Sequence, residues 1–462
     1  MQFRIRDFET EDKVCRQVQL STFQAVLTNA MIDDVLALTG RVTRRERKLN
    51  LRLMVWIVVG LGWFADCSIP RVLGKLLQGT SLWLGLDKAQ AAGGGALTYR
   101  RQQLGVRPLA LLCRQICRPL ATAQTPGAFA FGRRLVALDG TVDAVPDTPE
   151  NVAIFGRAAG RRGPSAWAQV RGVHLVECGT HALLGSTFWP YRVSERRGAR
   201  RLLAHLEPDW LVMWDSGFHS YEWLTAVQAR GADFLSRCPA TVKPEVVQTL
   251  ADGTRLVYLR PSDARQRRTC PPLLVRLIEY RLTDPAWAAN GKIFRLVTSL
   301  LDPVRYPVRE LLATYHLRWE FEVSLDEIET HQRLGAAVLR SRQPAGVMQE
   351  LYGLVLSHYL IRSVMSAAAA TGTATPIQLS FVAALELVRQ SIVEFQVVAP
   401  AHWPALFQRL LRDIAAAKLP PRRHRVVNRT VRRPLSKFQP KRGQARAPVQ
   451  PQTPWLDAFV LI

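Results

Sequence analysis

Two short apolar segments that each end in an aspartate constrain the fold of this chain most. Residues 134–139 read Arg-Leu-Val-Ala-Leu-Asp, and residues 210–215 read Trp-Leu-Val-Met-Trp-Asp. Short apolar runs bounded by turn residues predict buried β-strands. An acid at the end of such a strand is exposed at the edge of the sheet, where open α/β sheets place their ligands. The alternative is that Asp139 and Asp215 only begin turns with the glycines that follow them.

Around these two segments, residues 130–238 alternate between strand and helix patterns. The predicted order is three strands, a helix, a strand, a helix and a strand, and a turn at 178–181 joins the second strand to the third. A three-strand meander that leads into α/β alternation is the order of a ribonuclease-H-like core. The predicted strands span 134–139, 170–177, 183–188, 210–214 and 233–237, and the predicted helices span 194–206 and 220–230.

The rest of the chain divides by its periodicity. Before residue 126 the pattern is helical, the stretch 239–307 has β patterns with turn signals at Asp252-Gly253 and Asn290-Gly291, and helical patterns return from Val308. We therefore predict an α/β chain: a ribonuclease-H-like core with a β-rich insertion, plus a helical N-terminal domain and a helical C-terminal region. The predicted regions are the N-terminal domain (1–125), the first part of the core (126–238), the insertion (239–307), a helix that completes the core (308–340), the C-terminal helices (341–417) and a basic tail (418–462).

The charge balance predicts a polyanionic partner. The chain carries 62 Lys and Arg against 37 Asp and Glu, a formal charge of +25, and a field of that sign usually serves nucleic acid. Eleven of these cations, four prolines and no acid lie between Lys418 and Arg446, so we expect an extended tail that contacts DNA backbone. A basic surface that serves only solubility is the alternative.

A second basic segment has two interpretations. Thr98–Gly105 reads Thr-Tyr-Arg-Arg-Gln-Gln-Leu-Gly, which places basic and amide side chains on one small helix. This helix either reads DNA or presents a solvated face, and the sequence does not choose between the two.

The sequence gives little support for a membrane or export function. Its longest apolar run, Leu53–Phe64, has twelve residues, whereas a bilayer span takes roughly 20, and no signal-peptide core follows the start. The seven cysteines are scattered without zinc spacing, so we expect reduced cysteines that act as small hydrophobic residues. This use of cysteine fits a reducing cytoplasm, and no membrane partner is expected.

Residues 315–322, Tyr-His-Leu-Arg-Trp-Glu-Phe-Glu, supply a third acid in a more specific pattern. Tyr315, Arg318 and Glu322 are spaced three and four residues apart, so a helix places them on one face. The carboxylate suits a metal ion, the arginine suits a phosphate oxygen, and the tyrosine offers a hydroxyl or a ring. A surface ion pair between Arg318 and Glu322 is the alternative.

Three carboxylates together indicate the chemistry of a metal-bound phosphate. Hard oxygen ligands suit Mg²⁺ or Mn²⁺ rather than zinc. Two such ions can clamp the attacking and leaving oxygens of an in-line displacement at phosphorus. We therefore predict that Asp139, Asp215 and Glu322 converge on two divalent ions.

Three sequence blocks together point to a known family. They are 136–141 with 145–151, then 214–218, and then 296–303 running into 315–331. They resemble the insertion-sequence-four group of DDE transposases, and the likeness extends from about residue 45 to 445. The third block is the most specific, because that group carries a Tyr-x2-Arg-x3-Glu-x6-Lys signature on the helix of its catalytic glutamate.

By position, the resemblance assigns roles to five residues. Asp139, Asp215 and Glu322 match the three catalytic, metal-binding acids of the group. Tyr315 and Arg318 match the signature residues that touch DNA near the cleavage point.

One signature position departs from the family. Glu329 stands where the signature lysine belongs, which replaces a phosphate-binding cation with an anion. We predict that Arg333, one turn further on, pairs with Glu329 or takes the place of the lysine in binding DNA. Further DNA contacts are predicted in the basic tail, at Arg422, Arg423, Arg425, Arg432 and Arg433.

The resemblance implies an enzyme that cuts DNA at the ends of its insertion element and joins them to target DNA, with two Mg²⁺ (or Mn²⁺) ions. It implies that the N-terminal domain binds the terminal inverted repeats, that the partners are double-stranded repeat and target DNA, and that a homodimer pairs two ends in a synaptic complex. It also implies a bacterial cytoplasmic, nucleoid-associated protein. Two alternatives stay open: a DNA-binding regulator with weakened catalysis, which Glu329 favours, and a metal-dependent DNA nuclease that cuts without joining.

Overall fold

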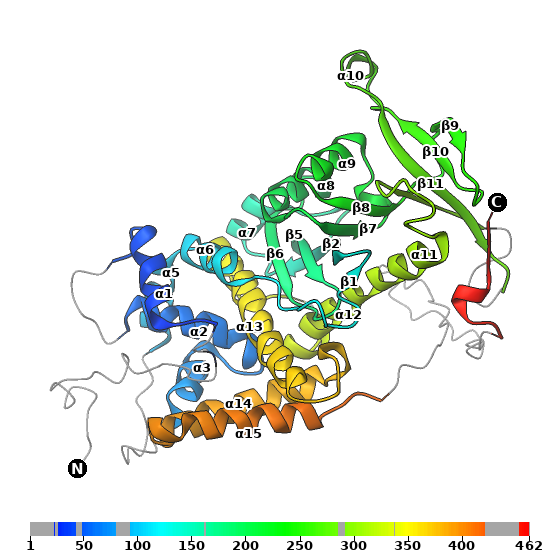
Figure 1. The fold of residues 1–462 in the computed structure, drawn as a ribbon. Helices are drawn as coiled ribbons and strands as arrows, with labels where there is room; N and C mark the ends of the chain where they lie inside the picture. The colour runs from blue at the N-terminus through cyan, green and yellow to red at the C-terminus, as the bar shows by residue number, and fades with distance from the viewer. Residues whose placement is uncertain are drawn as a thin grey trace, which may run out of the picture. The chain divides into compact units, whose positions relative to one another are not determined.

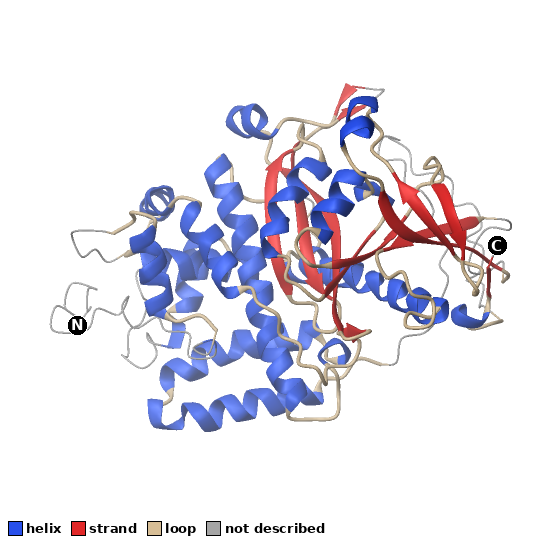
Figure 2. Cartoon of the chain, turned by 45° about the horizontal axis from the view of Figure 1, so that its top comes forward, coloured by secondary structure: helices blue, strands red, loops and turns tan. Residues whose placement is uncertain are grey.

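The computed structural model describes residues 23, 26–42, 49–79, 93–160, 163–284, 292–336, 338–420 and 452–461. The chain is of mixed α/β class, with many helices and a large mixed β-sheet (Figure 1, Figure 2). It forms two compact units. Unit 1 comprises Met1–Leu211 and Arg318–Leu419, and unit 2 comprises Val212–Leu317 and Pro420–Ile462.

The three long strands of unit 1 are antiparallel and neighbour one another in the order β6–β5–β2. Their register pairs Asp139 with His174 and continues as far as Val145 with Ala168. The prediction that strand β2 ends at Asp139 is therefore wrong. Residues 139–145 alternate between more and less buried positions and keep pairing with β5, so the acid lies within the strand. The strands are β2 (Arg133–Val145), β5 (Ala168–Glu177) and β6 (Leu183–Pro190).

Helices from both ends of the chain pack together in unit 1. Helix α2 (Leu51–Trp63), which covers most of the predicted buried helix, contacts α13 (Pro344–Ala370). A Cβ on Gly62 would lie 2.0 Å from Ser357 Oγ, and one on Gly353 would lie 2.6 Å from the carbonyl oxygen of Val58. Only glycine allows two helix backbones to approach this closely.

Helix α13 is the one helix among the described residues that is long and apolar enough to span a membrane. However, 83% of the most apolar 18-residue stretch of this helix is buried inside the structure. It contacts α2, α6, α14, α15 and β6, so it is the central helix of the unit 1 core. Its polar residues Ser357, His358 and Arg362 are buried as well.

The remaining elements of unit 1 are short or peripheral. The longer helices are α1 (Asn29–Leu38), α3 (Ile69–Leu76), α5 (Gly94–Leu104), α6 (Arg107–Ile116), α14 (Phe381–Val397) and α15 (Trp403–Ala416). The shorter elements are β1 (Phe129–Ala130), α7 (Pro149–Phe155), β3 (Ala159–Gly160), β4 (Gly163–Pro164), α8 (Glu195–Ala199), η4 (Arg200–His205) and α12 (Glu320–Asp326).

Unit 2 is built on strands in the order β7–β8–β12–β11–β10–β9, which are antiparallel from β8 onward. Helix α10 lies within the connection between β10 and β11, at the tip of that connection (Figure 1). The strands are β7 (Trp210–Trp214), β8 (Asp233–Arg237), β9 (Glu245–Thr249), β10 (Arg255–Leu259), β11 (Leu273–Leu282), β12 (Ile293–Thr298) and β13 (Phe459–Leu461), and the helices are α9 (Tyr221–Gln228), α10 (Ala264–Thr269) and α11 (Val308–His316).

Most of the predicted strands are confirmed. The predicted strands 210–214 and 233–237 coincide with β7 and β8 at both ends, and the β patterns predicted in 239–307 form β9 to β12. The predicted helix 194–206 is only partly α-helical, because α8 gives way to the 3₁₀ helix η4. The predicted turn at Asn290-Gly291 and residues 421–451 of the basic tail lie outside the described residues.

Candidate active site

Asp139, the first predicted acid, is held by an arginine from a distant part of the sequence. Arg318 Nη1 donates to Asp139 Oδ2 at 3.1 Å across 179 residues, and the Gly140 amide donates to Asp139 Oδ1 at 2.8 Å. The side chain of Asp139 is 21% exposed, so a ligand can reach it. Across the β2–β5 pair, burial lowers the pKa of His174 to about 3, so this histidine adds no charge beside Asp139.

Asp215, the second predicted acid, follows β7 in unit 2. It caps the short 3₁₀ helix η5 (Ser216–Phe218), and its Oδ1 accepts a hydrogen bond from the Gly217 amide at 2.8 Å. Tyr315, near the end of α11, donates its hydroxyl to the carbonyl oxygen of Trp214 at 3.2 Å. Tyr315 is thus bound to the residue that precedes Asp215.

Glu322, the third predicted acid, lies on α12 with its side chain partly exposed. The helix that carries it is irregular at both ends. A 3₁₀ turn, η6 (Leu317–Trp319), separates α11 from α12, and a π-helical segment, η7 (Glu327–Gln332), follows α12. The spacing of Tyr315, Arg318 and Glu322 predicted one face of a single helix, but the 3₁₀ turn interrupts the α-helix between them. A 3₁₀ turn rotates the chain by more degrees per residue than an α-turn, so the spacing no longer places the three on one face. Arg318 pairs with Asp139 and not with Glu322.

The solvent-facing side of this helix is acidic. Glu322, Asp326 and Glu329 follow one another at spacings of four and three residues. The surrounding protein raises the pKa of Glu329 by partial desolvation, even though its side chain reaches solvent. The negative charge of Asp143 adds to that rise, Arg333 opposes it, and Asp326 and Glu322 contribute less. Glu329 thus lies in an electronegative environment.

Arg333 has a different partner from the predicted one. Its Nη1 donates to Asp143 Oδ1 at 2.6 Å, and its Nη2 donates to the carbonyl oxygen of Ala336 at 2.9 Å. The predicted pairing with Glu329 is therefore wrong: β2 continues past Asp139 and brings Asp143 to the arginine. Both side chains of this pair are less than a tenth exposed, and burial raises the pKa of Asp143 while Arg333 lowers it. With Glu329 they line a cavity of about 250 Å³. A contact between Arg333 and DNA stays a prediction.

The basic segment Thr98–Gly105 forms the end of α5, and neither interpretation of its arginines is correct. Arg100 and Arg101 are buried in unit 1, with exposures of 5% and 8%. They bind other parts of the same unit and do not present a solvated or DNA-facing surface. The tail residues Arg422, Arg423, Arg425, Arg432 and Arg433 lie outside the described residues.

The three predicted metal ligands have the donor type that Mg²⁺ and Mn²⁺ prefer, since each offers carboxylate oxygens. Asp139 and Glu322 belong to unit 1, and Asp215 belongs to unit 2. Within the part of the chain that the structure describes, no group of three or more His, Cys, Asp or Glu side chains is gathered closely enough to hold a metal ion. The convergence of the three acids stays a prediction.

Two protein families match the chain. The family "Insertion element 4 transposase N-terminal" matches residues 17–114, and the family "Transposase DDE domain" matches residues 130–360, half of the chain. The chain is a DDE transposase of the insertion-sequence-four group. The transposase is therefore an enzyme that cleaves and transfers DNA strands.

The transposase is similar along most of its length to a bacterial relative. Transposase InsG for insertion sequence element IS4, from Escherichia coli (strain K12), is 29% identical over 433 residues, which cover 93% of this chain and 96% of the relative. InsZ of the same organism is 29% identical over 253 residues, 52% of this chain and 80% of that protein. A chain in the cryo-EM structure of the piggyBac transposase synaptic complex with hairpin DNA is 10% identical, covers 87% of both chains and has a TM-score of 0.41. A structural likeness at that score supports no further argument.

Proposed function

We propose that the transposase cuts DNA at the ends of its insertion element and joins them to target DNA by two-metal-ion phosphoryl transfer. The contact between Arg318 and Asp139 carries this proposal. It joins β2 to the turn that immediately precedes the Glu322 helix, so a carboxylate and a guanidinium stand together on the surface of unit 1. Carboxylate oxygens bind Mg²⁺, and the arginine fork matches a phosphate.

In this proposal Asp139, Asp215 and Glu322 hold two Mg²⁺ or Mn²⁺ ions. When bound, the ions supply a polarised nucleophile and neutralise charge on the leaving oxygen. Arg318 has five N–H donors and uses one on Asp139, so it can hold a phosphate oxygen with the others. Tyr315, whose hydroxyl is bound to the backbone of Trp214, offers its ring to the DNA beside Asp215.

We propose double-stranded DNA, both the terminal inverted repeats and the target, as the partner. The exposed arginines of α10 support a DNA surface in unit 2. Arg265 and Arg268 are exposed and make no side-chain hydrogen bond or ion pair with the described residues, whereas Arg267 donates to the carbonyl oxygens of Pro261 and Ser262 and orders the turn. Free surface cations suit phosphate contacts that position DNA without reading its bases.

The finer architecture belongs to the same proposal. It comprises a ribonuclease-H-like core in 126–238 and 308–340, a β-rich insertion in 239–307 and a homodimer that pairs two DNA ends. Strands β9 to β12 in the stretch 239–307 support the insertion. A bacterial cytoplasmic location is supported by the six described cysteines, Cys67, Cys113, Cys117, Cys178, Cys238 and Cys270, which are all free.

The decisive experiment uses a supercoiled plasmid that carries the DNA flanking this coding sequence. With Mg²⁺, the full-length chain should cut at the element ends, and pre-cut ends should be joined to a target plasmid. Asp139→Ala, Asp215→Ala or Glu322→Ala should abolish cutting but retain end binding in EDTA. Asp326→Ala, which removes an exposed acid four residues after Glu322, is the matched control and should still cut. Binding without cutting would favour the regulator, and cutting without joining would favour the nuclease.

The departure at Glu329 gives a second test of the proposal. Glu329→Lys restores the family signature and exchanges a negative for a positive charge next to Asp143, Asp326 and Glu322. We expect stronger binding of element ends, with cleavage unchanged or faster, because the electronegative surface near the phosphate path is reduced. Gel-shift affinity and Mg²⁺-dependent cleavage measure the two effects. A clear loss of cleavage would instead identify Glu329 as an additional metal ligand.

A further inference from the structure

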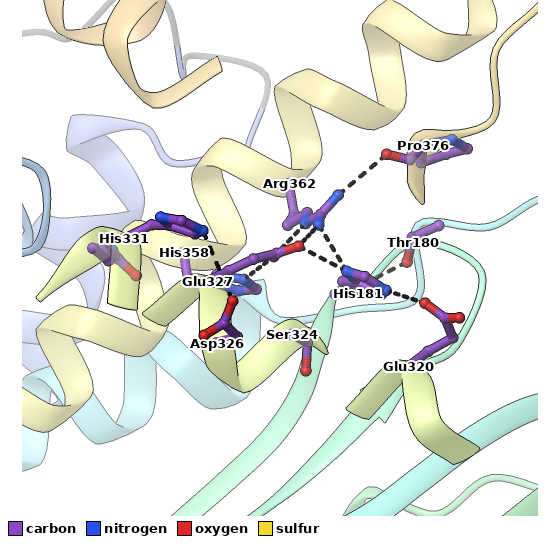
Figure 3. Close-up of polar contacts among 12 residues, drawn as sticks. Thr180, His181, Glu320, Ser324, Asp326, Glu327, His331, His358, Arg362 and Pro376 are labelled. Carbon is purple, nitrogen blue, oxygen red and sulfur yellow. Dashed lines mark hydrogen bonds and ion pairs between the residues drawn. The ribbon is translucent and has the colours of Figure 1, made fainter. Parts of the chain in front are cut away.

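A buried polar cluster lies in unit 1 behind the Glu322 helix, that is, α12 together with the π segment η7 that continues it. Its members are Glu320 and Glu327 on the helix, His181 on the β5–β6 turn, and His358 and Arg362 on α13, all less than 9% exposed (Figure 3). Glu327 is the centre: its carboxylate accepts from His358 Nε2 at 2.9 Å, from Arg362 Nε at 2.9 Å and also from Arg362 Nη2.

His181 connects the two glutamates. Its Nε2 lies 2.8 Å from Glu320 Oε2, and its Nδ1 lies 2.9 Å from Glu327 Oε1. Arg362 Nη2 also lies 2.7 Å from His181 Nδ1. The imidazole therefore bridges two successive turns of the helix and ties both of them to β5 and α13.

The two bridged glutamates flank the proposed catalytic residue. Glu320 and Glu327 are seven residues apart, so they lie on the same helix face. Glu322 follows Glu320 by two residues, which turns it by roughly 200° to the opposite face. Holding Glu320 and Glu327 from behind therefore fixes the direction in which Glu322 points.

The backbone at His181 is strained in favour of this arrangement. Its φ is +58°, in the left-handed region that glycine adopts readily and that other residues, histidine included, adopt much less often. The turn is closed by hydrogen bonds from the amides of Thr180 and His181 to the carbonyl oxygen of Glu177, at 3.3 and 2.9 Å. A non-glycine residue persists in such a conformation where its side chain makes contacts that a glycine lacks.

Stability alone does not account for this cluster. Removing carboxylates and a guanidinium from water is costly, and well-packed apolar residues of similar volume often stabilise a core as well or better. Buried ionic groups are useful where they specify one geometry among several. The helix needs such specification, because it changes from a 3₁₀ turn to an α-helix and then to a π segment within sixteen residues, 317–332.

We propose that His181 is a positioning residue for the transposition reaction: by bridging Glu320 and Glu327, with Arg362 as their counter-charge, it fixes the orientation of the Glu322 helix. The proposal rests on the proposed metal-binding role of Glu322. Gln332 supports the same docking from the end of the π segment, where its Nε2 donates to Ser357 Oγ of α13. In this proposal His181, which is 1% exposed, contacts neither DNA nor metal itself.

The test compares His181→Gly with the wild type in the full-length chain bound to element-end DNA. Glycine adopts the positive φ without strain, so any loss in this variant comes from the missing imidazole and not from added backbone strain. The readouts are the Mg²⁺ concentration that half-saturates the rise of Tm caused by Mg²⁺, and the Mg²⁺ concentration for half-maximal cleavage. We expect both to increase about tenfold, as is typical when groups that orient a metal ligand are lost. End binding in EDTA should be unchanged.

Two variants make the result specific. Glu350→Gln removes another buried carboxylate from α13, one that binds Arg340 and Ser341 outside the cluster, and should lower Tm without changing the Mg²⁺ midpoint. Glu322→Ala should remove the Mg²⁺ response. If Glu322→Ala does so and His181→Gly keeps the wild-type midpoint, the cluster is only structural and the inference is wrong. If Glu322→Ala keeps the response, the proposed metal site itself fails. Should His181→Gly not fold, His181→Asn, which also tolerates positive φ, is measured in the same way.

Discussion

Helices α5 and α10 have similar basic sequences and opposite environments. In α5 of unit 1, Arg101 Nε donates to Gln349 Oε1 at 3.2 Å and Nη2 donates to the carbonyl oxygen of Gly346 at 3.2 Å, while Arg100 Nε donates to the carbonyl oxygen of Leu49 at 2.6 Å. In α10 of unit 2, no residue is buried. Burial lowers the pKa of Arg101, whereas Arg265 and Arg268 of α10 are exposed.

The difference shows what a count of basic residues leaves out. Arginine has a long apolar stem and five donors, so one helix can use it to satisfy buried carbonyl groups and another to reach a partner. Helix α5 is held between the N-terminal helices and α13, whereas α10 is ordered by local contacts such as the Asp263 cap. The arginines of α5 serve the core, whereas Arg265 and Arg268 of α10 are the ones that we propose contact DNA.

The largest expected effect comes from Arg101→Met. The change removes the guanidinium N–H groups that donate to Gln349, Ser341 and Gly346, and it leaves these buried acceptors with fewer partners. We expect the free energy of unfolding to fall by about 2–4 kcal/mol, with no change in the salt dependence of DNA binding. Denaturant unfolding measures the first quantity and gel shifts at several salt concentrations measure the second. Arg107→Met, at an exposed position on the next helix, is the control. A reduced salt slope in Arg101→Met would show that α5 does contact DNA.

A smaller effect is expected from the double substitution Arg265→Ala and Arg268→Ala. Each phosphate contact contributes about 0.9 to the slope of log K against log salt, so the slope should decrease by about 2. Affinity should weaken equally for element-end and unrelated DNA, and the free energy of unfolding should stay within about 0.5 kcal/mol of the wild type. An unchanged slope would mean that α10 is merely a solvated tip.

The smallest effect is expected from Arg265→Lys with Arg268→Lys. Lysine keeps the charge but loses the planar fork. If the two residues act as point charges toward phosphates, both the salt slope and the affinity should match the wild type within error. A several-fold loss of affinity at constant slope would show that the arginines grip phosphates with two donors each.

Sequence patterns were most informative where burial is periodic. Strands 210–214 and 233–237 were predictable because their apolar runs are short and bounded by turn residues. The extension of β2 to Val145 was not predictable, because Gly140, Thr141 and Asp143 interrupt the apolar pattern. Their pairing with β5 cannot be read from the local sequence. The 3₁₀ and π segments around Glu322 also have no distinct local signature.

The candidate site could be predicted only where the residues that act together are close to one another in sequence. The spacing of Arg318 and Glu322 indicated phosphate chemistry, but nothing in it revealed that Arg318 would bind Asp139 or that Arg333 would bind Asp143. These partners are far apart in sequence. The cluster around Glu327 was missed for the same reason, since its five members come from three separate segments.

The position of Asp139 within a strand also has a kinetic consequence. The β2–β5 hydrogen-bond ladder continues on both sides of this residue, and amides inside such a ladder exchange with solvent only when a large part of the unit opens. Loop motions are faster, on the nanosecond to microsecond scale. If Asp139 binds metal as we propose, its backbone should therefore stay fixed relative to β5 while DNA binds, and adjustment to the DNA should come from side chains.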